Sequence, residues 1–218
     1  MSLSEAKLLE LRRQMVDAQL RSRQINDPRI LGAFMDTPRE KFIPPGWQHD
    51  AYSDCPVPIG YGQTISQPYV VALMVHELDV EDTHRVLDVG CGSGYQTAVI
   101  ARLARHVYGI ERIGQLTERA TALLRELGLT NVTLRTGDGS LGWPEEAPFD
   151  RIICGAASPE APQSWIDQLA DGGRVVTPVG GPDVQTLVVV TRQGDSISRR
   201  SVCDVRFVKL IGKEGWPG

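Results

Sequence analysis

A glycine-rich turn follows an apolar run near the middle of the 218-residue chain. Residues 86–94 read Val-Leu-Asp-Val-Gly-Cys-Gly-Ser-Gly, and glycines at the end of a strand let the backbone approach a ligand closely. The G-x-G-x-G spacing differs from the G-x-G-x-x-G of dinucleotide-binding proteins. Asp88, just before the turn, suits a cationic ligand and repels a pyrophosphate. The segment therefore favours S-adenosylmethionine, which carries a sulfonium and no phosphate. The turn residues expected to contact it are Gly90, Gly92, Ser93 and Gly94.

Two further carboxylates stand at the ends of the next apolar runs. Glu111 lies about twenty residues past the turn, where a carboxylate can bind both ribose hydroxyls of S-adenosylmethionine or of NAD. Asp138 precedes Gly139 after the third run, where it could accept the adenine amino group. Any one of these acids alone is explained as a solvated turn residue, but together with Asp88 they favour a cofactor site. The alternative from a different class is an NAD-binding oxidoreductase, which the glycine spacing and Asp88 disfavour.

Apolar runs alternate with helical patterns after Pro68, and these elements must position the acids and the glycines. The alternation predicts a Rossmann-like α/β fold: a doubly wound, mostly parallel sheet that is covered on both faces. Residues 186–191 and 202–210 flank a Gln-Gly-Asp turn and predict an antiparallel hairpin at the C-terminal edge. The predicted strands are 85–89, 107–110, 132–135, 151–154 and 174–179, and the predicted helices are 71–78, 95–104, 114–127 and 162–169.

The first third of the chain has a different character. A capping box formed by Ser2 and Glu5 predicts one helix, and Asp27-Pro28 predicts a second that ends near Met35. Prolines and glycines then punctuate residues 44–62, which predicts a loop without regular structure that serves as a working surface. We expect a single domain over residues 1–218, with N-terminal helices and a substrate-side loop over 1–67 and the catalytic core over 68–218.

Composition limits the classes of function. The formal net charge of −4 gives no broad basic field, so nucleic-acid binding is disfavoured. No apolar run is long enough to span a bilayer, and the first residues do not resemble a signal peptide, so a cytoplasmic location without membrane association is expected. The four cysteines are widely spaced and none lies at ligand spacing from a histidine, so no metal site is expected. No coiled-coil pattern is present, and a monomer is expected.

The segment before the glycine turn carries the most specific pattern. Residues 60–69 read GYGQTISQPY and residues 90–97 read GCGSGYQT. In these two motifs and their order, the chain resembles the protein-L-isoaspartate O-methyltransferases. The similarity continues through REKF at 39–42 and VRFVKL at 205–210, and it covers nearly the whole chain after the first helix. Lys209 and Ile211 depart from the family pattern near the closing strand, in a region that the resemblance implies to border the substrate peptide, so they bear on peptide preference.

The resemblance implies a methyl transfer from S-adenosylmethionine to the α-carboxylate of L-isoaspartyl residues in damaged proteins and peptides, with S-adenosylhomocysteine as the second product. The methyl ester then forms a succinimide without the enzyme, and hydrolysis regenerates some normal aspartate. Ser66 is implied as the active-site residue, and Gln63, Thr64, Ile65 and Ser66 are implied to border the cofactor. From the residues alone, the N-cap of the next helix is the better explanation of Ser66, and the resemblance reverses that order.

The implied chemistry needs few acid–base groups. A carboxylate with an ordinary pKa near 4 is already ionised at neutral pH, so catalysis rests on placement and partial desolvation. No motif connects any of the four histidines to Ser66. The alternatives are a methyltransferase of the same class that acts on a different carboxylate or a small molecule, and a non-catalytic binding member of the family.

Overall fold

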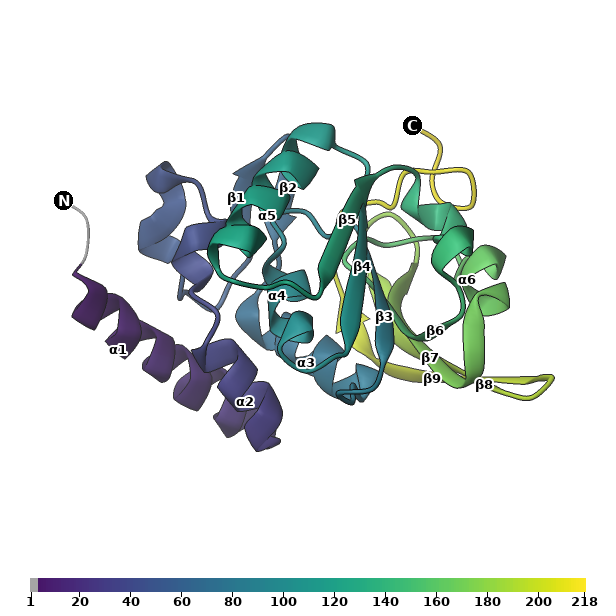
Figure 1. The fold of residues 1–218 in the computed structure, drawn as a ribbon, viewed down its shortest axis with the longest axis horizontal. Helices are drawn as coiled ribbons and strands as arrows, with labels where there is room; N and C mark the ends of the chain where they lie inside the picture. Colours follow the sequence, from purple (N-terminus) through teal and green to yellow (C-terminus); the bar gives the residue numbers. More distant parts are fainter. Residues whose placement is uncertain (1–3) are drawn as a thin grey trace.

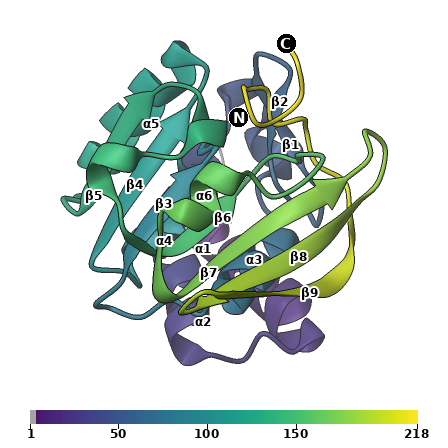
Figure 2. The same ribbon diagram turned by 90° about the vertical axis from the view of Figure 1, so that its right-hand side faces the viewer.

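The structure, a computed structural model, describes residues 4–218 and contains a central seven-stranded sheet. The strand order is β5-β4-β3-β6-β7-β8-β9, with parallel pairing from β5 to β7 and antiparallel pairing of β7 with β8 and of β8 with β9. Figure 2 shows β5 at one side of this sheet and β9 at the other. The predicted doubly wound sheet with an antiparallel edge hairpin is confirmed. The bounds are β3 Arg85–Val89, β4 His106–Glu111, β5 Val132–Thr136, β6 Phe149–Cys154, β7 Leu169–Gly180, β8 Gln185–Gln193 and β9 Ser196–Val205.

The second strand of the hairpin lies earlier in the chain than predicted. β9 covers Ser196–Val205, whereas the sequence pattern indicated residues 202–210. The first residues of β9, an edge strand, are exposed and polar apart from Ile197, so no apolar alternation marks where it begins. The apolar residues after Val205 leave the sheet and turn toward the cavities described below.

Helices cover both faces of the sheet (Figure 1). Alternate strand residues point into two separate cores, as Val86 and Leu87 on β3 illustrate. The Val86 core includes α3, α4 and α5, and the Leu87 core includes Trp165 of α6. Within residues 4–218, no helix has the length and apolar character needed to cross a membrane. The helix bounds are α3 Pro68–Leu78, α4 Tyr95–Ala101, α5 Gly114–Glu126 and α6 Gln163–Asp167.

Two N-terminal helices form an outer cover (Figure 1). α1, Glu5–Met15, continues through the short turns η1 (Val16–Leu20) and η2 (Arg21–Arg23), and α2 covers Pro28–Met35. The side chain of Asp27 caps α2 by accepting the amide of Arg29, as predicted. The predicted cap Ser2 lies outside the described residues, and the side chain of Ser4 caps α1 instead. The buried residues of this cover share one core with α3 and α4.

The prediction of no regular structure over residues 44–62 was wrong for its last part. β1, Val57–Gly60, and β2, Gln63–Ile65, form an antiparallel hairpin, and two short 3-10 helices precede it: η3, Arg39–Phe42, and η4, Pro45–Asp50. The glycines that suggested disruption supply the positive φ values of the hairpin turn, +94° at Gly60 and +70° at Gly62. The hairpin and the C-terminal segment lie at the same end of the sheet (Figure 2).

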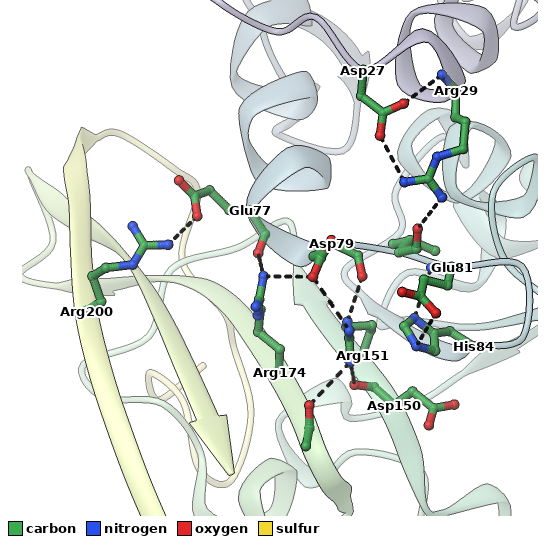
Figure 3. A network of polar contacts seen from close by, with 12 residues as sticks. Asp27, Arg29, Glu77, Asp79, Glu81, His84, Asp150, Arg151, Arg174 and Arg200 are labelled. Carbon is green, nitrogen blue, oxygen red and sulfur yellow. Dashed lines mark hydrogen bonds and ion pairs between the residues drawn. The ribbon is translucent and has the colours of Figure 1, made fainter. Parts of the chain in front are cut away.

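Arginines hold the opposite end of the sheet together (Figure 3). Arg174 donates a hydrogen bond to the carbonyl of Glu77, and Arg151 donates one to the carbonyl of Asp79, at distances of 2.8 and 3.0 Å. Arg29 of α2 donates to the carbonyl of Val80 at 3.2 Å. These bonds satisfy carbonyls at and beyond the C-terminus of α3, which helical hydrogen bonds leave free. The amino ends of the strands are thus tied to the helices, and the carboxyl ends are left to form the site.

Candidate active site

Two adjoining cavities lie at the carboxyl ends of the parallel strands. The first, which we call the glycine-turn cavity, has a volume of about 370 Å³. The second, the Ser66 cavity, has a volume of about 830 Å³. Both lie within the range of roughly 300–1,000 Å³ that is typical of ligand pockets. They share three wall residues: Thr64 at the end of the hairpin, Gly155 after β6 and Val208 after β9.

The glycine-turn cavity is built where β3 and β4 end. Gly90 and Gly92 line it with φ values of +71° and +54°, a conformation that residues with a side chain rarely adopt. The amide of Gly92 donates to Oε2 of Glu111 at 3.0 Å, and Oε1 accepts the amide of Ile113 at 2.9 Å. Glu111 is 7% exposed and lines the cavity. The glycine-turn amide that a phosphate would use is therefore already bound to a carboxylate.

Asp88 lies behind the turn. It is completely buried, and its two oxygens accept hydrogen bonds from Thr97 at 2.6 Å and from Gln96 at 2.8 Å. Burial raises the pKa of Asp88 to about 6, although both hydrogen bonds act in the opposite direction. Asp88 does not line the glycine-turn cavity. Its hydrogen bonds with Gln96 and Thr97 connect the end of β3 to the first turn of α4.

Five other residues predicted to contact the cofactor also do not line the glycine-turn cavity: Ile65, Ser66, Ser93, Gly94 and Asp138. Gly94 faces α5, where an added Cβ would stand 3.1 Å from the Cβ of Ala120. Ser93 lines a separate hollow beside Leu116, and Ile65 is buried in the core opposite its strand partner Val57. The predicted residues that line the cavity are Gln63, Thr64, Gly90, Gly92, Glu111 and Gly139.

Asp138 lies beneath the C-terminal segment, next to the cavity wall formed by Gly139. Its Oδ1 accepts the amide and the hydroxyl of Ser140 at 2.9 and 2.7 Å, and its Oδ2 accepts the amide of Lys213 at 2.8 Å. Partial burial raises the pKa of Asp138, but the hydrogen bonds from Ser140 and Lys213 outweigh it and hold the pKa below its ordinary value. The carboxylate is thus fixed in its ionised form.

The family resemblance implied that the region of Lys209 and Ile211 in the C-terminal segment borders the substrate peptide, whereas the tail after Leu210 was not predicted as part of the site. The segment's residues Lys209, Leu210 and Ile211 line the glycine-turn cavity. Glu214 accepts hydrogen bonds from the amide and the hydroxyl of Ser164, the second residue of α6. The tail after Leu210 is short and has no periodic pattern. Its position is fixed by hydrogen bonds with distant residues, Asp138 and Ser164 of α6. No local pattern in the sequence identified the tail after Leu210 as part of the site.

Ser66 lines the second cavity, between β2 and α3. Its hydroxyl forms no hydrogen bond with another residue of the described part of the chain. The N-cap of α3 is Gln67 and no side-chain capping bond is present, so Ser66 does not serve as the cap. Most other residues that line this cavity are apolar, and Asp204 and Arg206 are the charged exceptions. The apolar lining residues are Pro56, Val70, Val184, Val205, Phe207 and Val208.

The cavity residues fit S-adenosylmethionine. The glycine turn offers close backbone approach, and the oxygens of Glu111 keep lone pairs for two hydroxyl donors at the cavity wall. A second ligand in the Ser66 cavity would lie against the same three residues, Thr64, Gly155 and Val208, as the first ligand. Among residues 4–218, no group of three histidine, cysteine, aspartate or glutamate side chains is placed to bind a metal ion. The arrangement therefore suits a direct transfer between two bound molecules.

Comparison with known proteins gives the same assignment. The sequence profile of the protein-L-isoaspartate(D-aspartate) O-methyltransferase (PCMT) family matches residues 10–215. A protein-L-isoaspartate O-methyltransferase of Methanoregula boonei is 52% identical over 205 residues, which are 94% of each chain. A protein-L-isoaspartate O-methyltransferase 2 of Marinobacter nauticus is 50% identical over 212 residues, 96% of this chain and 97% of its own.

Solved structures are similar over the same length. A structure of a protein-L-isoaspartate O-methyltransferase covers 94% of this chain and 67% of its own, with a TM-score of 0.84 and 28% identity. A Plasmodium falciparum chain described as a beta-aspartate methyltransferase, in complex with S-adenosyl-L-homocysteine, covers 93% and 99%, with a TM-score of 0.81 and 26% identity. The profile match and the curated relatives extend over nearly the whole sequence. This chain belongs to the protein-L-isoaspartate(D-aspartate) O-methyltransferase family.

Proposed function

We propose that the chain methylates the α-carboxylate of L-isoaspartyl residues, with S-adenosylmethionine in the glycine-turn cavity and the damaged residue in the Ser66 cavity. The observation that carries this proposal is the shared wall of Thr64, Gly155 and Val208. Ligands in the two adjoining cavities would both lie against these three residues, and a direct transfer between them would need no covalent enzyme intermediate. Placement of the reacting atoms is then the main source of rate acceleration.

The cofactor would be held mainly by groups at the strand ends. Glu111 would accept the ribose hydroxyls, since its oxygens lie at the cavity wall and are fixed by two backbone amides. Gln63, Thr64, Gly90 and Gly92 would enclose the remainder. Asp138 would accept the adenine amino group if the cofactor extends past Gly139. When bound, S-adenosylmethionine supplies a methyl group on a cationic sulfur.

Ser66 would orient the acceptor. Its hydroxyl has no partner within the described chain and lines the acceptor cavity, so it can donate a hydrogen bond to one oxygen of a substrate carboxylate. The second oxygen is then free to attack. Because a carboxylate is ionised at neutral pH, the serine needs no general base. The resulting ester leads to a succinimide through the neighbouring backbone amide of the substrate, without further action by the enzyme.

The Ser66 cavity, with a volume of about 830 Å³, has room for residues that flank the damaged site as well as for the isoaspartyl side chain. Its apolar lining would contact residues that flank the damaged site.

Paired peptides test the proposal. One peptide contains a normal aspartate and its partner contains isoaspartate at the same position, and both are incubated with methyl-labelled S-adenosylmethionine. The expected result is base-labile label on the isoaspartyl peptide alone. Binding of S-adenosylhomocysteine without label on either peptide would overturn the repair assignment and point to another acceptor.

A further inference from the structure

Arg39 is a buried charge that neither cavity uses. It lies on η3 beneath the N-terminal cover, and its side chain is 0% exposed. Within residues 4–218 it forms no ion pair with a carboxylate. Burying an arginine without a counter-ion costs several kcal/mol unless its donors are well bonded. The contacts of this guanidinium therefore indicate what it does.

The guanidinium connects three segments that are distant in sequence. Its Nε donates to the carbonyl of Ala51 at 2.7 Å, and its Nη2 donates to the carbonyl of Ser66 at 2.8 Å. Its carbon lies 4.8 Å from the ring centroid of Tyr95, the first residue of α4 after the glycine turn. Phe34 and Phe42 pack edge-on against the same ring. Arg39 thus places the Ser66 backbone relative to the helix that begins beside the cofactor turn.

The backbone at Ser66 has few other supports. The ladder between β1 and β2 ends one residue earlier, at the pair formed by Val57 and Ile65. The next helix begins at Pro68, which has no amide hydrogen, and its N-cap makes no side-chain capping bond. Gln67 is held by its side-chain contacts with Asp54 and by the amide of Val71, which donates to its carbonyl, whereas the carbonyl of Ser66 is held by the hydrogen bond from Arg39.

We propose that Arg39 is a positioning residue for methyl transfer, which acts by holding the carbonyl of Ser66 so that the serine hydroxyl points into the acceptor cavity. The planar fork is essential, because one guanidinium must reach two carbonyls and lie on an aromatic ring at once. A lysine carries the same charge on a single nitrogen and cannot reproduce that arrangement. The inference rests on the proposed role of Ser66.

The test compares Arg39→Lys with a matched control, Arg12→Lys. Arg12 belongs to the same N-terminal cover, is partly buried, and donates to the hydroxyl of Tyr52, the carbonyl of Met35 and the carboxylate of Glu40, with no hydrogen bond to the Ser66 segment. We expect Arg39→Lys to lower kcat for an isoaspartyl peptide by about 10- to 100-fold, because small displacements of a reacting geometry have effects of this size. The affinity for S-adenosylhomocysteine should change by less than about threefold, and Arg12→Lys should leave kcat unchanged.

A double-mutant cycle separates positioning from general destabilisation. If Arg39 acts through Ser66, Arg39→Lys should lower kcat by less than about threefold in a Ser66→Ala background. A further loss of about 10-fold or more in that background would overturn the inference, as would an unchanged kcat in Arg39→Lys alone. Arg39→Gln provides a second variant if Arg39→Lys does not fold. Absence of methyl transfer to the isoaspartyl peptide by the unmodified protein would instead contradict the proposed function, so the two failures are distinguishable.

Discussion

The backbone amide of Gly92 donates a 3.0 Å hydrogen bond to the carboxylate of Glu111, which connects the glycine turn to the end of the neighbouring strand. The same carboxylate accepts the amide of Ile113. Glu111 is therefore held from both sides before any ligand binds, and a group that is fixed in advance loses little entropy on binding. The turn and the acid form one unit, and neither would be correctly placed without the other.

Replacing Glu111 by glutamine tests this unit. The amide keeps the shape of the side chain but loses the charge and one acceptor oxygen, so hydrogen bonds worth about 1.5–3 kcal/mol to a charged group are weakened. We expect the Kd of S-adenosylhomocysteine to rise by roughly 10- to 100-fold, measured by titration calorimetry. Glu118→Gln, on the exposed face of α5, is the control and should bind normally. An unchanged Kd in Glu111→Gln would show that the ribose lies elsewhere.

Asp88 predicts a specific pH dependence of stability. Its native pKa of about 6 exceeds its ordinary value of 3.8 because it is buried, so the folded protein binds this proton more tightly than the unfolded chain does. The stability gained from protonation is fully present below about pH 4 and is lost as the pH rises through 6. A difference of about two pH units corresponds to about 3 kcal/mol.

Asp88→Asn should remove that pH-dependent part. Between pH 4 and 7, the free energy of unfolding of the variant should rise relative to that of the unmodified protein by up to about 3 kcal/mol, measured by urea titration at each pH. Asp195→Asn, in the exposed turn between β8 and β9, should show no such trend. A difference that stays constant with pH would mean that Asp88 titrates normally.

The C-terminal segment should contribute to cofactor affinity. Glu214 fastens it by accepting two hydrogen bonds from Ser164, and the segment in turn supports Asp138 and forms part of the cavity wall. Glu214→Ala should raise the Kd of S-adenosylhomocysteine by about 3- to 10-fold, since one or two such bonds contribute about 1 kcal/mol each. Lys213→Ala is the matched control, because Lys213 binds Asp138 through its backbone amide. Equal affinities for both variants would exclude a role for the fastening.

Much of the core was predictable because local patterns report buried surfaces directly. β3 and α2 occur at their predicted bounds, since an apolar strand before glycines and a cap before a proline are local signals. β9 was displaced because an exposed edge strand has no apolar face to detect. The hairpin of β1 and β2 was missed because the glycines of its turn, Gly60 and Gly62, are equally consistent with an irregular loop.

The site was predicted less completely for a similar reason. Gly90, Gly92 and Glu111 line the cavity as expected. Asp88 and Gly94 belong to the same sequence motif as the two glycines, but they face the helices α4 and α5 instead of the cavity. A motif identifies which residues gather at a strand end, while the direction of each side chain depends on the packing behind it. Arg39 and the C-terminal segment act through contacts between distant parts of the chain, which no local pattern contains.

Ser66→Ala tests the central claim most directly, with two quantities measured on one preparation. These are the single-turnover rate of methyl transfer to an isoaspartyl peptide and the Kd of S-adenosylhomocysteine. If Ser66 orients the acceptor, the rate should fall by about 100-fold while the Kd changes by less than about twofold. An unchanged rate, or a fall in rate matched by an equal loss of cofactor affinity, would contradict the assignment of Ser66 to the acceptor cavity.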